Sequence, residues 1–250
     1  MKISVITVCY NSENTIEETI KSVIDQDHKE VEHIIIDGGS TDNTKKIISK
    51  YDSFIKSVTS EPDDGIYDAI NKGISKSSGE VISILHSNDI FYDKKILSNI
   101  SDEFKNDQKI KILMSDVIFK KKFNDDKVTR YYSSNFFKPW LLRLGFSPPH
   151  PSTFILKKVY DDIGLYNKIF KIAGDFDFFL RCFLINKYEY KIVNKCSVIM
   201  SPGGLSGKNI YSYYQSSKEI LKSFKYNKIY SNIFLILLRF PIKIIQFIIK

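Results

Sequence analysis

Three short polar clusters carry side chains that could bind a phosphorylated ligand or a metal ion. They are Cys9-Tyr10-Asn11, the segment 37–42 (Asp-Gly-Gly-Ser-Thr-Asp) and His86-Ser87-Asn88-Asp89. Each directly follows an apolar run, and ligands of open parallel sheets bind where loops leave the carboxyl ends of the strands. Taken singly, such acids more often form turns or cap helices. The convergence of three clusters therefore predicts a binding site.

The apolar runs before these clusters alternate with helical patterns. Strands are expected at 3–9, 34–36, 54–59 and 81–85, and helices at 16–24, 41–50 and 66–74. In the third helix, Ile66, Ala69, Ile70 and Ile74 recur at helical spacing. Strand–helix–strand repeats of this kind predict parallel strands that are joined by right-handed crossovers and covered on both faces.

Beyond residue 90 the pattern predicts a mixed arrangement. A helix is expected at 94–105, strands at 110–119, 128–132 and 197–200, and a helix at 175–185. Asn124-Asp125 favours a turn between two of these strands, and we expect a rigid Pro-rich loop at 148–151 and a flexible connection at 202–207.

Composition limits the possible classes of protein. A chain of 250 residues with 43% hydrophobic residues can build one main domain. The net charge of +8 by itself selects no partner. The widely spaced Cys9, Cys182 and Cys196 predict buried thiols, and the first residues carry no secretory signal, so we expect a cytoplasmic protein.

Two common phosphate-binding motifs are absent. No Gly-x-Gly-x-x-Gly follows the first strand, and no Gly-Lys-Ser/Thr occurs in the chain. This disfavours dinucleotide and P-loop sites, so a different nucleotide site is needed.

Four ordered segments carry a resemblance to a known family. The segments 5–11, 36–42, 60–73 (Ser-Glu-Pro-Asp-Asp-Gly-Ile-Tyr-Asp-Ala-Ile-Asn-Lys-Gly) and 85–89 resemble motifs of family-2 glycosyltransferases, of the type found in bacterial polysaccharide biosynthesis. The resemblance extends over about residues 1–180. It implies an α/β protein of the GT-A fold, with a Rossmann-like, mainly parallel central sheet flanked by helices. We expect a glycosyltransferase domain at 1–208, divided into a donor half at 1–92 and an acceptor half at 93–208.

The resemblance also implies which residues bind the nucleotide-sugar donor. The expected contacts to base and ribose are Thr7, Tyr10, Asn11 and Asp37, with Gly38 and Ser40 in the same motif. Ser87 and Asn88 follow the fourth strand. Asp68 and Lys72 are expected to face the donor, although their spacing also allows an ordinary surface ion pair. His150 matches a loop near the donor sugar, although a lone His in such a loop is more often structural.

The cluster after the fourth strand matches the Asp-x-Asp element, which in the family holds a divalent metal ion, Mn²⁺ or Mg²⁺. His86 and Asn88 stand where acids often occur, which leaves Asp89 as the metal-binding carboxylate. Such a cation prefers oxygen ligands and neutralises charge on the leaving diphosphate. The departures from the pattern are expected to weaken metal affinity.

The segment 173–181 (Ala-Gly-Asp-Phe-Asp-Phe-Phe-Leu-Arg) resembles the family's acidic motif at the start of a late helix. The resemblance makes Asp175 the catalytic base, with Asp177 in support. An aromatic, partly desolvated setting raises the pKa of a carboxyl group and makes it a better base. The alternative is that Asp175 caps the helix and Asp177 interacts with its positive end.

The C-terminal part, 209–250, is expected to form helices that attach the protein to a membrane. From Ile229 onward the chain is apolar, apart from a polar stripe at helical spacing that includes Asn232, Arg239 and Lys243. Basic residues inside the apolar run argue against a spanning helix and favour an interfacial one on the cytoplasmic face of the inner membrane. The alternative is a helix packed on the main domain or on a partner subunit.

Together these features predict an inverting glycosyltransferase that moves a sugar from a nucleotide-diphosphate sugar to a saccharide or lipid-linked acceptor, as in capsule or O-antigen synthesis. A sugar-nucleotide pyrophosphorylase is one alternative, but the chain lacks the Gly-rich basic loop expected for a triphosphate. A basic nucleic-acid-binding module is another, but the lysines are dispersed, so no nucleic-acid partner is expected.

Overall fold

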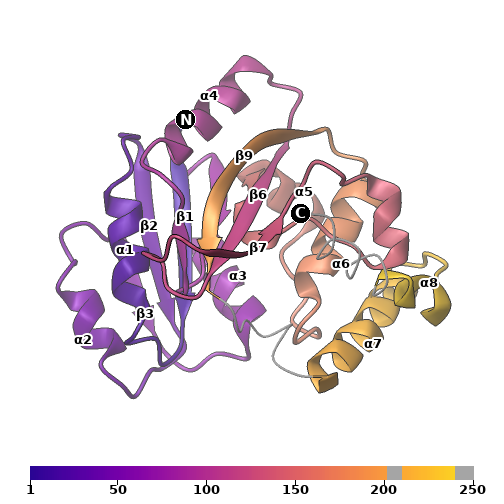
Figure 1. Cartoon of the computed structure of the whole chain (residues 1–250), viewed down its shortest axis with the longest axis horizontal. Helices are drawn as coiled ribbons and strands as arrows, with labels where there is room; N and C mark the ends of the chain where they lie inside the picture. Colours follow the sequence, from indigo (N-terminus) through magenta and orange to yellow (C-terminus); the bar gives the residue numbers. More distant parts are fainter. Residues whose placement is uncertain (202–209, 240–250) are drawn as a thin grey trace.

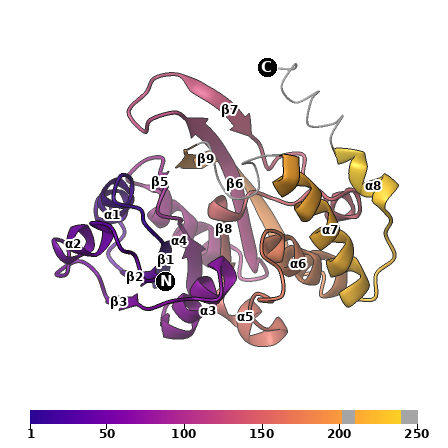
Figure 2. The same cartoon turned by 90° about the horizontal axis from the view of Figure 1, so that it is seen from below.

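The computed structural model describes residues 1–201 and 210–239. Its centre is a nine-stranded mixed sheet with the order β3-β2-β1-β4-β8-β6-β9-β5, and β7 pairs with β6. Helices α1 and α2 lie at one end of the molecule and α7 and α8 at the other, with the sheet between them (Figures 1 and 2). The expected connection at 202–207 lies outside the described residues.

The first half follows the predicted order of elements. Its strands and helices are β1 (Ile3–Cys9), α1 (Ile16–Ile24), β2 (Val31–Asp37), α2 (Thr44–Ser49), β3 (Ser57–Ser60), α3 (Ile66–Lys76) and β4 (Val81–Ile84). As predicted, β1 pairs in parallel with β2 and β4, and β2 with β3. Cys9 lies opposite Asp37 in the register, so the first two polar clusters leave the sheet at the same edge.

The second half is mixed, as predicted. It contains β5 (Asp89–Phe91), α4 (Ile96–Asn106), β6 (Ile112–Lys120), β7 (Val128–Tyr132), the 3-10 turns η1 (Pro139–Leu144) and η2 (His150–Ser152), β8 (Thr153–Leu156), α5 (Lys157–Ile163), α6 (Gly174–Leu180), the π-helical turn η3 (Arg181–Ile185) and β9 (Tyr190–Met200). β8 pairs antiparallel with β4 and β6, whereas β9 runs parallel to β6. The short elements β5, β8 and α5 were not predicted, and β9 begins earlier than residue 197.

Alternating side chains give the parallel strands two apolar faces. Ile6 and Val8 of β1 pack in one cluster with α3 and α6, whereas Ile3 and Val5 pack in a second cluster with α4. A third cluster joins Cys9 to α1 and α2. Because neighbouring residues of a strand face opposite sides, Thr7 lies on the face opposite to α3.

The C-terminal part contains two helices within the described residues, α7 (Ile210–Tyr226) and α8 (Ile233–Leu237). Of the apolar helix expected from Ile229 onward, residues 240–250 lie outside the described part. Two residues of the predicted polar stripe form hydrogen bonds within the protein. Asn232 caps α8 by accepting a hydrogen bond from the Leu235 amide, and the buried Arg239 donates one to Ser217 of α7. Within 1–201 and 210–239, no helix is long and apolar enough to cross a bilayer.

Candidate active site

A pocket of about 870 Å³ opens at the carboxyl ends of β1 and β4, between α3, the β6–β7 hairpin and α6. Several predicted residues line it: Tyr10, Asn11, Ser87, Asn88, Asp89, His150 and Asp175. Two of the three predicted clusters, 9–11 and 86–89, therefore meet at one site with residues of the second half, whereas no residue of 37–42 lines the pocket.

The loops after β1 and β2 are fixed to each other by side chains. The buried Asp37 carboxylate accepts hydrogen bonds from the Ser40 amide (3.1 Å), the Ser60 hydroxyl (2.6 Å) and the Ser40 hydroxyl. Ser40 Oγ in turn accepts a hydrogen bond from the Asn11 amide at 2.8 Å. Asp37 and Ser40 therefore do not line the pocket, contrary to expectation; they hold the loop that carries Tyr10, whose ring is 62% exposed beside the pocket.

Gly38 allows this loop to approach a residue that sequence reasoning did not single out. A Cβ at Gly38 would lie 2.5 Å from Oδ2 of Asp63, which lines the pocket and caps the turn before α3 by accepting from the Gly65 amide. A side chain at this position would therefore displace the Asp63 carboxylate from its present place. Asp63 lies in the motif 60–73, and that motif was its only sequence signal.

Thr7, Asp68 and Lys72 do not reach this pocket, contrary to expectation. Thr7 is fully buried on the opposite face of β1, with Oγ1 2.9 Å from Nε2 of His33. On α3 it is Tyr67 and Ile70 that face the pocket, so the helical rotation turns Asp68 and Lys72 away. These two form an ion pair of 3.3 Å and line a separate, shallower hollow.

The floor of the pocket contains buried polar groups with unmet hydrogen-bonding capacity. Ser87 Oγ lies 2.9 Å from Ser12 Oγ, but neither carboxylate oxygen of Asp89 nor Nδ1 of His86 has a partner among the described residues. Burial raises the pKa of Asp89 well above its usual value and lowers that of His86 to about 4. The described residues include no group of three or more His, Cys, Asp or Glu side chains that could hold a metal ion unaided.

His150 belongs to an aromatic cluster behind the pocket. Its Nε2 lies 2.7 Å from the Tyr166 hydroxyl, and its ring centroid lies 5.8 Å from that of His86. Burial, with a smaller effect of His86, lowers the pKa of His150 to about 3. The imidazole is therefore neutral at physiological pH and helps to shape the pocket wall.

Asp175 stands at the start of α6, where it lines the pocket. Its Oδ1 accepts from the Phe176 amide at 2.8 Å and lies 3.2 Å from the Tyr67 hydroxyl. Burial raises the pKa of Asp175 despite these two hydrogen bonds. At Gly174, a Cβ would lie 2.7 Å from the Tyr67 ring, so the glycine lets α3 and α6 approach closely.

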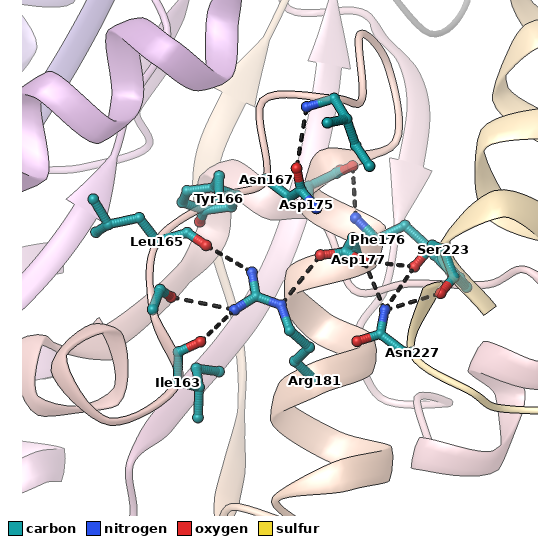
Figure 3. Close-up of polar contacts among 12 residues, drawn as sticks. Ile163, Leu165, Tyr166, Asn167, Asp175, Phe176, Asp177, Arg181, Ser223 and Asn227 are labelled. Carbon is teal, nitrogen blue, oxygen red and sulfur yellow. Dashed lines mark hydrogen bonds and ion pairs between the residues drawn. The ribbon is translucent and has the colours of Figure 1, made fainter. Parts of the chain in front are cut away.

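Asp177, on the same helix, does not line the pocket, and Figure 3 shows its carboxylate among Arg181, Ser223 and Asn227. Its carboxylate is fully buried and binds Arg181 Nε at 3.1 Å, and it accepts hydrogen bonds from Ser223 and Asn227 of α7, both at 2.8 Å. Arg181 also donates to the carbonyls of Ile163 and Leu165, both at 2.7 Å. Asp177 thus joins α6 to α7 and to the loop before α6.

Three further pocket residues were not predicted: Arg130, Tyr132 and Lys171. The Arg130 guanidinium lies 5.2 Å from the ring centroid of Phe119 and 5.3 Å from that of Tyr132, so the β6–β7 hairpin presents a cation flanked by aromatic rings. The turn signal at Asn124-Asp125 predicted the hairpin but not its position over the pocket.

Comparisons with known proteins agree with this architecture. A model of Glycosyl transferase family 2 matches residues 4–164. An uncharacterised glycosyltransferase of Mycobacterium tuberculosis is 31% identical over 188 residues, which make up 73% of this chain and 69% of that protein. The putative teichuronic acid biosynthesis glycosyltransferase TuaG of Bacillus subtilis is 38% identical over 97 residues, or 38% of each chain.

Solved structures share the fold. TarS of S. aureus (residues 1–349), in complex with UDP-GlcNAc, superposes with a TM-score of 0.70 at 21% identity, over 90% of this chain and 66% of that one. The mannosyltransferase PcManGT from Pyrobaculum calidifontis, in complex with GDP-Man and Mn²⁺, gives 0.64 at 14% identity, over 90% and 64%. This chain thus spans about two thirds of those structures. The predicted GT-A architecture is confirmed, and with the match over residues 4–164 and the 31% identical relative, the chain belongs to glycosyl transferase family 2.

Proposed function

We propose that this glycosyltransferase is an inverting enzyme that moves a sugar from a nucleotide-diphosphate sugar to a saccharide or lipid-linked acceptor. One observation carries the proposal: Asp175, a carboxyl group whose pKa is raised by burial, lines the same pocket as the partnerless carboxylate of Asp89. The pocket thus combines a group suited to accept a proton with a group suited to a cation.

The loops at the ends of β1 and β4 would bind the nucleotide. Tyr10 offers an exposed aromatic face for a base, and Asn11 and Asp63 offer polar groups beside it. Asp37, Gly38 and Ser40 would act indirectly, by fixing the shape of this loop. The complexes of TarS with UDP-GlcNAc and of PcManGT with GDP-Man support a nucleotide-sugar donor without deciding which one.

A divalent cation, Mn²⁺ or Mg²⁺, fits the chemistry of the pocket floor. Both Asp89 oxygens lack partners among the described residues, and a buried carboxylate needs a counter-charge or a proton. Asp89 would hold the ion, with the Asn88 carbonyl oxygen as a second ligand. When bound, the cation neutralises charge on the leaving diphosphate. With so few protein ligands, we expect the ion to bind with the nucleotide rather than before it.

Asp175 would act as the base. An acceptor hydroxyl attacks the sugar carbon from the side opposite the diphosphate, and Asp175 takes its proton as the new bond forms. The raised pKa favours this transfer because it brings the proton affinity of the carboxylate closer to that of the reacting group. Attack from the opposite side inverts the configuration at that carbon.

The acceptor would belong to cell-surface polysaccharide synthesis at the cytoplasmic face of the inner membrane. The similarity to TuaG supports a polysaccharide pathway. Helices α7 and α8 and the segment between them carry exposed aromatic side chains, among them Tyr211, Tyr226, Tyr230 and Phe234, and the exposed Lys222, Lys225 and Lys228 belong to the same part of the chain. Aromatic and basic residues together suit an anionic lipid surface, which supports peripheral attachment.

The direct test is turnover of a panel of UDP-, GDP- and dTDP-sugars, measured as release of nucleoside diphosphate with and without Mn²⁺. We expect release from donors of one nucleotide class by the wild type, and binding without release by Asp175→Asn. Equal release by both proteins would remove Asp175 from the mechanism. Failure of every donor would refute the proposed function.

A further inference from the structure

Glu219 of α7 lies far along the chain from the catalytic motif, yet it contacts the segment that leads into it. Its Oε2 accepts hydrogen bonds from three consecutive backbone amides, those of Lys171 (3.0 Å), Ile172 (2.8 Å) and Ala173 (2.9 Å). The Lys171 amide also lies 3.1 Å from Oε1. Glu219 is only 8% exposed, so these are buried, charge-assisted hydrogen bonds.

These contacts fix the immediate surroundings of Asp175. The bonded segment ends two residues before Asp175, and the Ile172 carbonyl within it accepts a hydrogen bond from the Tyr67 hydroxyl at 2.8 Å. The same hydroxyl lies 3.2 Å from Asp175 Oδ1, so its single proton is shared between the two acceptors. Movement of the 171–173 segment would therefore change both the position of Asp175 and the hydrogen bond that it receives.

Glu219 also adds negative charge near Asp175. Burial is the largest cause that raises the pKa of Asp175, and the charge of Glu219 raises it further by a smaller amount than the hydrogen bonds of Asp175 lower it. The other titratable groups around Asp175 are Tyr67 of α3, Tyr132 of β7 and Tyr166, while Lys171 and Arg130 line the same pocket. Glu219 is the acidic neighbour that α7 contributes.

We propose that Glu219 is a positioning residue for the catalytic base: its carboxylate binds the 171–173 amides and thereby sets the location of Asp175. This inference rests on the proposed function of Asp175. It assigns to α7 an indirect part in the reaction, through the position of Asp175, in addition to its place in the fold.

If Glu219 only held α7 in place, weakening another contact between α6 and α7 should have the same effect as changing Glu219. Asp177 of α6 makes such a contact. Asn227, which directly follows α7, donates a hydrogen bond to Asp177 at 2.8 Å, and Asp177 does not line the pocket. Asn227→Ala is therefore a matched control: it weakens the contact between α6 and α7 without altering the amides or the charge beside Asp175.

The experiment compares wild type, Glu219→Gln, Glu219→Asp and Asn227→Ala. Glu219→Gln retains the size of the side chain but loses its charge, so we expect kcat to fall about tenfold with little change in KM for the donor. The acid limb of its pH–rate profile should move to lower pH, because loss of a neighbouring negative charge lowers the pKa of Asp175. Glu219→Asp retains the charge, so its acid limb should stay near that of wild type.

Amide hydrogen exchange of the 170–176 segment supplies a readout that needs no turnover. We expect exchange about tenfold faster in Glu219→Gln and unchanged in Asn227→Ala. The inference is overturned if Glu219→Gln matches Asn227→Ala in kcat, acid limb and exchange while the wild type is active. An inactive wild type would instead refute the proposed function and, with it, this inference.

Discussion

Helix α6 presents two aspartates, two positions apart, to two different surroundings (Figure 3). On the α7 face, Asp177 is fully buried and its oxygens are bound by Arg181, Ser223 and Asn227. On the pocket face, Asp175 receives one backbone hydrogen bond and shares the Tyr67 proton, and burial raises its pKa. A carboxylate with a full set of partners stabilises the fold, whereas one with few partners keeps its capacity to react.

The same contrast separates the ends of β2 and β4. Asp37 binds two serine hydroxyls and a backbone amide, whereas Asp89, equally buried, has no partner for its side-chain oxygens among the described residues. The partnerless group needs either a proton or a ligand. Of these four acids, the two with full sets of partners stabilise the structure, and the two with few partners are those that we propose to act in the reaction.

The largest effect is expected from the pocket face of α6. Asp175→Asn should lower kcat by roughly 10³-fold, because the amide cannot accept the acceptor's proton. At neutral pH the variant should be at least as stable as wild type, because it no longer carries a buried charge. Steady-state kinetics and thermal unfolding together check this. If Asp175→Asn loses activity only because it unfolds, Asp175 would be a structural residue like Asp177.

The α7 face should respond in the opposite way. Asp177→Ala should lower the free energy of unfolding by about 3 kcal/mol, because it leaves the largely buried Arg181 without its carboxylate. Denaturant unfolding measures this loss. Lys158→Ala removes an exposed pair at the same spacing, Lys158 with Asp162, and should cost no more than about 0.5 kcal/mol. Similar losses in the free energy of unfolding would show that burial does not determine how much these two ion pairs contribute to stability.

The raised pKa of Asp175 predicts a pH dependence. The base must be deprotonated, so kcat/KM should rise with pH through a pKa above the usual range of Asp. His150, with its pKa lowered to about 3, should add no limb near neutrality. Stability should change with pH in the opposite direction to activity. Wild type should become less stable as the pH rises through this pKa, and Asp175→Asn should not. A profile with an unshifted acid limb would contradict the assignment.

The smallest effect is expected at the rim. Tyr10 is 62% exposed, so Tyr10→Ala should leave stability unchanged but weaken nucleotide binding by about tenfold through lost stacking on the base. Fluorescence or calorimetric titration would measure this. Phe54→Ala, at a ring that is 61% exposed but does not line the pocket, is the matched control and should bind as wild type does.

Local patterns were sufficient to predict the parallel half. Helical spacing and apolar runs predicted the elements from β1 to β4, and the loops after β1 and β4 meet at the pocket, whereas residues 37–42 do not line it. The patterns failed for short elements such as β5 and β8, which form because long-range pairing with β9 and with β4 and β6 stabilises them. Propensity over three or four residues cannot reveal such pairing.

Residues of the candidate site could be predicted only where they lie in a recognisable sequence motif. Asp175 and Tyr10 came from motifs, but Arg130, Lys171 and Glu219 reach the site through tertiary packing that no local pattern reports. The motifs also did not reveal toward which side of the sheet each side chain points. Thr7 lies in a motif but faces away, because adjacent residues of a strand point to opposite sides.

Calorimetric titration with UDP, GDP and dTDP, each with and without Mn²⁺, on wild type and Asp89→Ala, tests the central claim most directly. The account predicts that one nucleotide binds, that Mn²⁺ strengthens its binding, and that Asp89→Ala abolishes the effect of the metal. Failure of all three to bind the wild type, or binding that is indifferent to both Mn²⁺ and Asp89, would contradict it.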